Sequence, residues 1–266
     1  MKKKTKIAPF VVSTIVVFCL SIVGCSDEGP APEQKAQSAE EAKQIAKVEE
    51  KASATKEGIA APERPTDADL MAFKVYHHMM YMVTTAEQAG GTNKLFHTRQ
   101  LPTEGTDPVV SPALDHIYTK AVIDLSEGPV IVEMPKVTDG RYYSIHITDQ
   151  EHYAIYDKIY PVGKFAFVRK GKAMAAPKDA TVIECPGDYP HLFIRIQVRT
   201  PDDLENVHRL QDEIVLTGIS KKLTIDNPIS HTIKTHDVYP QNKEILASAV
   251  NFSKEDYLRV SKYIGV

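Results

Sequence analysis

The sequence predicts an α+β fold, mainly an antiparallel β-sandwich or barrel, with an N-terminal helix, a closing helix after the strands and a short C-terminal helix. Apolar, β-rich runs follow one another between residues 117 and 199, separated by Gly, Pro and Asp. Strands so closely spaced are typical of antiparallel sandwiches and barrels rather than of alternating β-α units. The strand candidates are Ile117–Leu125, Pro129–Met134, Tyr142–Thr148, His152–Tyr156, Phe165–Arg169, Thr181–Cys185 and Leu192–Arg199.

Helix-start motifs flank these runs. Thr66 and Asp69 have the spacing of a capping box, and Gly90 with Gly91 ends the segment that they open. The predicted buried stripe of this N-terminal helix, at helical spacing, is Leu70, Phe73, Tyr76, Met80 and Val83.

The closing helix is predicted to begin at Thr200, with Pro201 in its first turn and Asp202 and Asp203 at its positive end. Its predicted buried stripe is Leu204, Val207, Leu210 and Ile214. Residues 221–241, rich in Asn, His and Pro, are expected to be irregular, and a second capping box from Ser253 to Asp256 predicts the C-terminal helix, with Tyr257, Leu258 and Tyr263.

The N-terminus has the pattern of a secretory signal. Lys2, Lys3, Lys4 and Lys6 precede an apolar run from Ile7 to Val23, and Gly24-Cys25 completes a segment that resembles a bacterial lipoprotein cleavage box. Cys25 is then the predicted lipidation site, and Ser26 rather than Asp after it resembles outer-membrane sorting. The alternative is an uncleaved anchor helix, because the run is barely as long as a minimal membrane span.

The remaining composition describes the mature protein. Cys19 leaves with the signal, so Cys185, within an apolar run, is expected to be a buried thiol without a disulfide partner. The net charge of −3 and the absence of a basic stripe after the signal predict no nucleic-acid partner. These signals divide the chain into a signal peptide (1–24), a flexible or helical spacer (25–65), a β-rich domain (66–220) and a C-terminal extension (221–266).

Several motifs resemble one family. Val109-Val110-x-Pro112-x-x-Asp115-x-x-Tyr118, Asp124-Leu125-x-x-Gly128-Pro129-Val130 and Gly140-Arg141-Tyr142-Tyr143-Ser144 are similar to the family called domain of unknown function 1254, over roughly residues 70–218. Phe96-His97-x-Arg99 fits its upstream loop, and Thr200-Pro201-Asp202-Asp203-Leu204 its closing helix. The resemblance implies a β-rich, envelope-associated domain and no settled activity.

The sequence departs from the family pattern twice. Many members continue into a second β domain, called domain of unknown function 1214, whereas only about 45 residues follow the closing helix here. Ala113 and Leu114 stand where members commonly carry an Asn before the Asp and Tyr.

One strand carries a candidate pocket. Alternation along residues 141–149 places Tyr143, Ile145 and Ile147 on a core face and Tyr142, Ser144, His146 and Thr148 on the opposite face, which either lines a polar pocket or meets solvent. Asp, His, Tyr and Arg side chains near that face form a plausible acid–base or anion-binding set. The candidate pocket residues are Asp115, His116, Tyr118, Arg141, Tyr143, His146, Asp149, His97 and Arg99.

Structural roles are the competing interpretation and the one that we favour, because turn Asp and strand-edge Tyr residues are common in sandwiches. A metal reading would draw on His97, His116, His146, His152 and His191, but no short-spaced ligand pair lies among them, so no metal or other cofactor is predicted. Gly-x-Ser-x-Gly and glycine-rich phosphate loops are absent from the sequence.

The sequence thus predicts a lipid-anchored protein of the bacterial cell envelope, in the outer membrane and facing the periplasm. Its expected partners are the membrane, through the N-terminal lipid, and a small ligand or an envelope protein. The favoured function is a binding or structural module. The alternative is an envelope enzyme, hydrolase-like or metal-assisted, that uses Asp115, Tyr118, Arg141 and His146.

Overall fold

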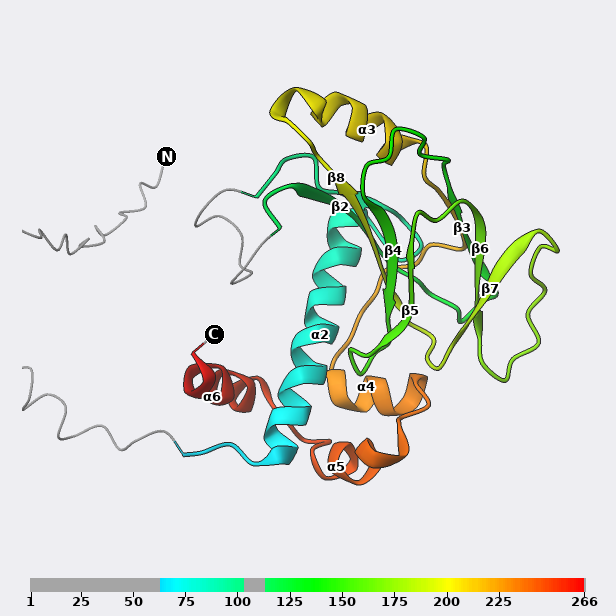
Figure 1. Ribbon diagram of the computed structural model, residues 1–266. Coiled ribbons are helices and arrows are strands. Elements are labelled where there is room, and N and C mark those ends of the chain that lie inside the picture. Colours follow the sequence, from blue (N-terminus) through cyan, green and yellow to red (C-terminus); the bar gives the residue numbers. More distant parts are fainter. Residues whose placement is uncertain (1–62, 103–112, 266) are drawn as a thin grey trace, which may run out of the picture. The chain divides into compact units, whose positions relative to one another are not determined.

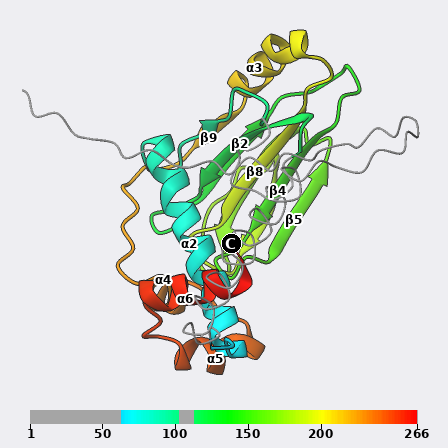
Figure 2. The same ribbon diagram turned by 90° about the vertical axis from the view of Figure 1, so that its left-hand side faces the viewer.

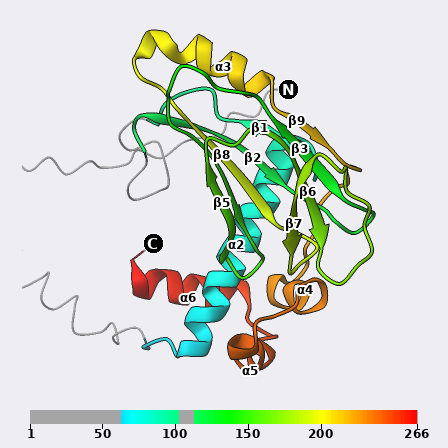
Figure 3. The same cartoon turned by 45° about the vertical axis from the view of Figure 1, so that its right-hand side comes forward.

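The structure, a computed structural model, describes residues 63–102 and 113–265. The predictions on the signal, Cys25 and the spacer lie outside the described residues. Every residue described below belongs to one unit, Pro62–Val266. In that unit two β-sheets stand face to face (Figures 1 and 3).

The larger sheet has the strand order β1-β2-β8-β4-β5 and is called the large sheet below. Its strands, in that order, are Phe96–His97, His116–Val122, His191–Gln197, Tyr143–Thr148 and Ala154–Ile159. The small sheet has the order β7-β6-β3-β9. Its strands are Ala180–Cys185, Gly163–Arg169, Val130–Met134 and Val215–Thr217. All seven predicted strands are present, and the strands of the described residues that the sequence did not predict are the short β1 and β9.

The pairing is antiparallel with one exception. Strands β6 and β7 are parallel, with Phe165 opposite Thr181 and Phe167 opposite Ile183. Residues 170–179 therefore form a crossover connection, which departs from the mainly antiparallel arrangement predicted, because the sequence carries no signal of strand direction. Two mostly antiparallel sheets with helices confirm the α+β class, and within the described residues the sheets form no closed barrel.

The main core lies between the two sheets. The core face predicted for β4 is confirmed, because Tyr143, Ile145 and Ile147 are fully buried in it. Cys185 is also buried there, as predicted, and burial raises the pKa of its thiol to about 12. A thiol with so high a pKa is a small apolar side chain rather than a nucleophile at neutral pH.

Helix α2, Asp67–Ala89, begins and ends as predicted, with a Thr66–Asp69 capping box and Gly90 in the left-handed conformation (φ 77°). The predicted buried stripe is wrong in part, because Leu70 and Met80 are exposed. The residues that α2 buries include Ala72, Val75, Met79, Met82 and Ala86. The buried face is therefore offset from the predicted stripe, since Met79 and Met82 are buried where the spacing argument selected Met80 and Val83.

Three helices of the C-terminal extension pack against α2 and form a second apolar core with it. They are α4, Pro228–Thr235, α5, Lys243–Ser248, and α6, Lys254–Ile264. Phe73 and Tyr76 of α2 stack on Tyr257 of α6, at ring centroid distances of 4.9 and 5.0 Å. Figure 1 shows these helices at the end of α2 away from α3.

The prediction that residues 221–241 are irregular is wrong in part. Residues 221–241 are not wholly irregular, because Asn227 caps α4 and Pro228 occupies its first turn. That cap–Pro pair was the signal missed in the sequence. The Ser253–Asp256 capping box of α6 is confirmed, but Leu258 and Tyr263 are exposed.

The closing helix is α3, Leu204–Asp212, preceded by a 3-10 turn at Pro201–Asp203. Val207 and Ile214 are buried as predicted, with Leu204 and Leu210 packed beside them. The capping role of Thr200 is wrong, because its side chain makes no capping hydrogen bond. Among the described residues, no helix combines the length and apolar character needed to cross a membrane.

Candidate functional site

The outer face of the large sheet carries three cross-strand rows of side chains. Tyr118, Arg195 and Ser144 are aligned across β2, β8 and β4. The next row is Lys120, Phe193 and His146, and the last is Val122, His191 and Thr148. The fixed register therefore brings residues from three distant parts of the sequence to one surface.

Helix α2 covers one end of this face (Figure 2). The ring of Tyr81 lies 5.4 Å from that of His191 and 6.3 Å from that of Phe193, between ring centroids. His78 on α2 is buried as well, with its Nε2 atom 3.5 Å from the Thr148 hydroxyl. The row of Val122, His191 and Thr148 is consequently closed off from solvent.

The other end of the face holds a pocket. Its volume is about 540 Å³, and its lining residues are Ala113, His116, Tyr118, Tyr142, Arg195 and Gln197. That volume is within the range typical of small-molecule sites, roughly 300–1,000 Å³. The lining includes one cation, two tyrosines and no carboxylate.

His116 of the lining is paired with Asp115, which lies just outside the lining. The Nδ1 atom of His116 lies 2.6 Å from Oδ1 of Asp115, and this hydrogen bond lowers the pKa of Asp115. Nδ1 is thus the donor to the carboxylate. The Nε2 atom of the ring is buried and has no hydrogen-bond partner among the described residues.

Gln197 fixes the floor of the pocket. Its Oε1 atom accepts from the backbone N–H of Tyr142 at 3.2 Å, and its side chain also bonds to Asp115. Tyr142 stands edge-on to the His116 ring, with 5.2 Å between centroids and an interplanar angle of 85°. The side chains of Gln197, Asp115 and His116 are therefore held in place before any ligand arrives.

Arg195 is the one charged residue of the lining. Its guanidinium carbon lies 5.9 Å from the Tyr118 ring centroid, and its Nε atom is buried without a hydrogen-bond partner in the described part of the chain. Within the same residues, no carboxylate pairs with it. A half-buried arginine without a counter-ion is unusual, because buried charge is normally paired.

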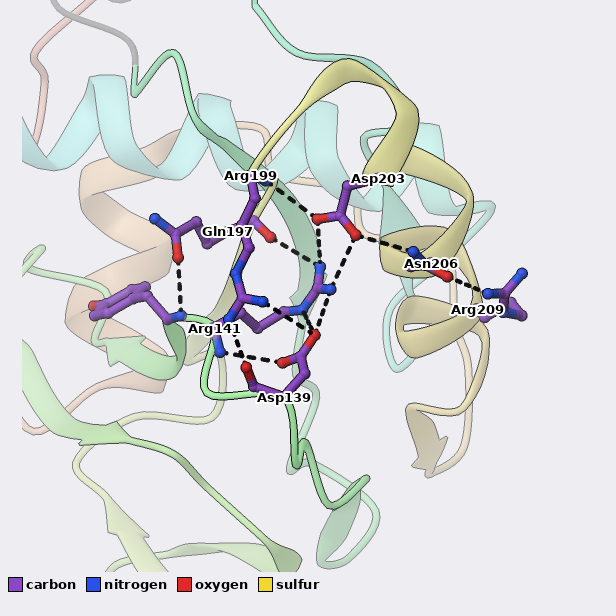
Figure 4. A network of polar contacts seen from close by, with 8 residues as sticks. Asp139, Arg141, Gln197, Arg199, Asp203, Asn206 and Arg209 are labelled. Carbon is purple, nitrogen blue, oxygen red and sulfur yellow. Dashed lines mark hydrogen bonds and ion pairs between the residues drawn. The ribbon is translucent and has the colours of Figure 1, made fainter.

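Arg141, a candidate from the family motif, lies in a different environment (Figure 4). Its guanidinium group donates to Asp139, to Asp203 at 2.9 and 3.0 Å, and to the Gln197 carbonyl at 3.1 Å. Burial alone would raise the pKa of Asp203, but the hydrogen bonds from Arg141 and its neighbours lower it to about 2. Arg141 therefore fastens the start of the closing helix to the large sheet and does not reach the pocket.

His146 and Tyr143, two further candidates, also lie away from the pocket. His146 is on the same outer face, one row beyond Arg195, with Nδ1 3.8 Å from a carboxylate oxygen of Asp157. Tyr143 points into the core, where its hydroxyl contacts the Met134 sulfur at 3.7 Å.

Asp149 organises the turn after β4. Its Oδ1 atom accepts from the backbone N–H groups of Glu151 and Tyr153, and Oδ2 accepts from the Tyr239 hydroxyl at 2.7 Å. Beside it, the buried Glu151 carboxylate bonds to His236 at 2.9 Å and to Asn242 at 2.7 Å. This network ties the C-terminal extension to the large sheet.

His97 and Arg99 face the closing helix. The Nδ1 atom of His97 lies 2.9 Å from the Thr119 hydroxyl, on the core side of β2. Arg99 donates to the His208 carbonyl, Gln211 and Asp212 of α3. Of the nine predicted pocket residues, the structure brings Asp115, His116 and Tyr118 together at the pocket and places the other six elsewhere.

The histidines considered as metal ligands do not converge. Among the described residues, no group of three or more His, Cys, Asp or Glu side chains is arranged to hold a metal ion. The ring of His78, on α2, stacks on that of His152 with 4.2 Å between centroids, and the His78 ring also lies 5.6 Å from that of His191. Burial lowers the pKa of His78 to about 3 and that of His191 well below its usual value, so these rings are uncharged at neutral pH.

Sequence reasoning missed Arg195 and Gln197. Their signal was the alternation in His191-Leu192-Phe193-Ile194-Arg195-Ile196-Gln197, where every second residue leaves the core. The family motifs drew attention to β2 and β4, and the pairing of β8 between them was needed to bring Arg195 beside Tyr118.

Comparison with known proteins agrees with the resemblance found in the sequence. Residues 92–218 match a family described as protein of unknown function (DUF1254), which confirms that the chain resembles it. The match begins after α2 and ends just after β9, so α2 and the C-terminal helices lie outside it. No curated protein matches the chain.

Two solved structures are similar to the chain. The crystal structure of the VPA0106 protein from Vibrio parahaemolyticus has a TM-score of 0.55 at 15% identity, covering 75% of this chain and 56% of that one. An uncharacterised protein from Burkholderia cenocepacia has a TM-score of 0.31 at 14% identity, covering 73% and 50%. The chain thus spans about half the length of these proteins. The first likeness supports the fold alone, and the second is too low to carry an argument.

Proposed function

Proceeding from the resemblance of residues 92–218 to a family of unknown function, we propose that this protein is a lipid-anchored module of the cell envelope that binds a small molecule. The proposed binding site is the pocket at the uncovered end of the large sheet. The observation that carries the proposal is the charge of this lining, because Arg195 forms no ion pair with a carboxylate of the described residues. A polar or anionic ligand in the pocket would offset part of the cost of burying that charge.

The rigidity of the site supports binding. The lining side chains project from three paired strands, and the Gln197 amide is held by bonds to Tyr142 and Asp115. A ligand therefore meets groups that are already ordered, and little conformational entropy is lost on binding.

The binding proposal is tested with a fragment library that contains anions, cations and neutral compounds. Saturation-transfer NMR on the full chain in detergent micelles should detect fragments whose signals disappear in the double variant Tyr118→Ala/Tyr142→Ala. The matched control is Tyr263→Ala, an exposed tyrosine of α6, which should bind the same fragments as the wild type. If no fragment of any class distinguishes the double variant from the wild type, the pocket is not a binding site.

The proposed anchor rests on the N-terminal sequence, where a basic segment, an apolar run and Gly24-Cys25 follow one another. Diacylation of Cys25 together with N-acylation would hold the domain stably at a membrane, since each buried methylene contributes about 0.8 kcal/mol. We place the protein in the outer membrane, facing the periplasm, because Ser26 rather than Asp follows the cysteine.

Palmitate labelling tests the anchor. Cys25→Ser should abolish incorporation of radiolabelled palmitate, whereas Cys19→Ser, within the signal, should leave it unchanged. Ser26→Asp should move the labelled protein to the inner-membrane fraction. Undiminished labelling of the Cys25→Ser protein would refute lipidation at this residue.

The Asp115–His116 pair favours a second candidate function, an envelope enzyme with a general base. A carboxylate on Nδ1 orients the ring so that Nε2 can take a proton from water or substrate. Ser144, the serine of these rows, lies two strands from β2, roughly 10 Å away, and is too far to act as a nucleophile activated by His116.

The enzyme candidate is tested on a panel of chromogenic esters and phosphate esters. His116→Gln and Asp115→Asn should each lower the rate at least about 100-fold, the usual contribution of a general base. His146→Gln is the matched control, because that ring lies one row from the pocket lining. Equal rates for the wild type and both pocket variants would exclude His116 as the base.

A further inference from the structure

We infer that the contact between α2 and the large sheet is an acid-sensitive switch, which opens when the buried histidines at that contact take up protons. This switch goes beyond the proposed function, because it concerns the covered end of the outer face and does not depend on a ligand in the pocket. It follows from the packing of the imidazole rings, the state of their nitrogen atoms and the charges around them.

Three histidine rings from distant parts of the chain meet where α2 covers the sheet (Figure 2). His78 comes from α2, His191 from β8, and the partly exposed His152 from the turn between β4 and β5. The ring centroid of His78 lies 4.2 Å from that of His152 and 5.6 Å from that of His191. The exposed fractions of His78 and His191 are 1% and 0%. Positive charges on these rings would therefore lie close together and away from water, which is unfavourable.

The nitrogen atoms of the two buried rings have few hydrogen-bond partners. Neither Nδ1 nor Nε2 of His191 has a partner among the described residues. His78 has a hydrogen bond to the Asp149 backbone, but its Nε2 atom is 3.5 Å from the Thr148 hydroxyl, at the limit of hydrogen-bonding distance. An imidazolium ring is a donor at both nitrogen atoms, so a proton added to His191 while α2 is in place would bury two unsatisfied N–H groups.

Burial opposes protonation as long as α2 stays in contact with the sheet. It lowers the pKa of His78 to about 3 and that of His191 well below 6.5. When α2 moves away, water reaches the rings and their pKa values return toward 6.5. Protons therefore bind the open state in preference to the covered one, and acid shifts the equilibrium toward opening.

The charged and titratable groups that face the cluster add to this bias. Those that lower the pKa of one or more of the three histidines carry or can acquire positive charge, and come from α2, β2 and β4: Lys74, His77, Lys120 and His146. The Asp149 carboxylate acts in the opposite direction on His152. Its oxygen atoms already accept from two backbone N–H groups of its own turn and from the Tyr239 hydroxyl. Neutralisation of a protonated cluster by this carboxylate would break those hydrogen bonds.

Few polar bonds hold α2 against the sheet. Lys120 on β2 donates to the Tyr81 hydroxyl at 2.6 Å, and the contact of His78 with Thr148 is long. The buried Thr85 hydroxyl of α2 has no partner among the described residues. The core between the two sheets is apolar by comparison. A contact with few hydrogen bonds and several unsatisfied polar atoms is expected to open locally, before that core unfolds.

Hydrogen exchange followed by mass spectrometry tests the switch on the full chain in detergent micelles. Peptides from residues 75–86 of α2 are compared with peptides from β6, which packs in the core between the sheets. Each buried histidine should raise the equilibrium constant for opening roughly 20-fold between pH 7 and 5. After correction for intrinsic exchange rates, we expect the protection of α2 to fall at least about 100-fold over this range and to end at least about tenfold below that of β6.

Three variants assign the protons to the cluster. His78→Leu and His191→Leu each remove one buried titratable group, so each should reduce the fall in α2 protection by about tenfold or more. His77→Gln is the matched control, because this exposed histidine lies on the same helix, and it should leave the fall unchanged. Circular dichroism at pH 7 verifies that each variant is folded, and the corresponding Gln variant replaces any Leu variant that is not.

The outcomes separate a local switch from general acid unfolding. Equal protection of α2 and β6 at every pH would show that α2 opens only when the whole domain unfolds, and the inference would be wrong. It would also be wrong if the protection of α2 did not change with pH, or if both histidine variants kept the full change. None of these results bears on the pocket, which the fragment experiment tests separately.

Discussion

Arg141 donates to the Gln197 carbonyl and Arg195 precedes Gln197 on β8, yet the surroundings of the two arginines are opposite. Arg141 is 3% exposed and donates to two carboxylates and a carbonyl, so its bonding capacity is used within the protein. Arg195 is half-buried at the rim of a pocket, with an unpartnered Nε and no ion pair to a carboxylate of the described residues. The first is a closed polar network and the second an open one, and the difference separates a structural arginine from a binding one.

The largest expected effect is on the closed network. Arg141→Met should lower the free energy of unfolding by about 3–5 kcal/mol, because Asp203 would stay buried without its cation. Urea denaturation measures the loss, and Arg209→Met, with an exposed side chain, should change stability by less than about 0.5 kcal/mol. A cost below 1 kcal/mol for Arg141→Met would remove the distinction between the two arginines.

The network around Glu151, which ties the C-terminal extension to the large sheet, is a second case in which the hydrogen-bonding groups are already paired. Glu151→Gln should cost about 2–3 kcal/mol, because the buried carboxylate accepts from His236, the Tyr239 backbone and Asn242. The exposed Glu244→Gln is the control and should be neutral within about 0.5 kcal/mol. Equal stabilities of the two variants would show that the Glu151 network contributes little.

The histidines buried at the covered end of the large sheet predict that the free energy of unfolding depends on pH. Burial lowers the pKa of His78 to about 3 and that of His191 well below 6.5, so between these values the unfolded chain binds protons that the folded chain does not. The free energy of unfolding should therefore fall as pH is lowered below 6.5, by up to about 1.4 kcal/mol per pH unit for each histidine. Urea titrations from pH 7 to 5 measure this slope.

The variant His191→Leu tests whether this slope of stability against pH comes from the buried histidines. It removes two buried nitrogen atoms that have no partner among the described residues, and it should reduce the slope by the share of one histidine. An unchanged slope would assign the acid sensitivity to other groups.

The smallest effect is expected at the open site. Arg195→Met should change the free energy of unfolding by no more than about 0.5 kcal/mol, since it breaks no ion pair of the described residues. The same urea series measures it beside Arg141→Met. A loss as large as that of Arg141→Met would mean that Arg195 is structural too.

Much of the fold was predictable from local patterns. Alternation located all seven predicted strands, and capping residues located the starts of α2 and α6, because both signals act within a few residues of the chain. The parallel β6–β7 pair and α4 were not predicted, the first because strand direction is a tertiary property and the second because Asn227-Pro228 stands in a segment of turn-like composition.

The site was predictable only in part, for the same reason. The sequence by itself determined that β4 buries Tyr143, Ile145 and Ile147, that Cys185 lies in the core, and that polar side chains gather on an opposite face. Tertiary structure decided which of those polar groups remain available. Strand order placed β8 between β2 and β4, the closing helix engaged Arg141, and α2 covered one end of the face while leaving Arg195 beside the Asp115–His116 pair. A side chain's chemistry is written in the sequence, but whether its hydrogen bonds are already used depends on residues that only folding brings to it.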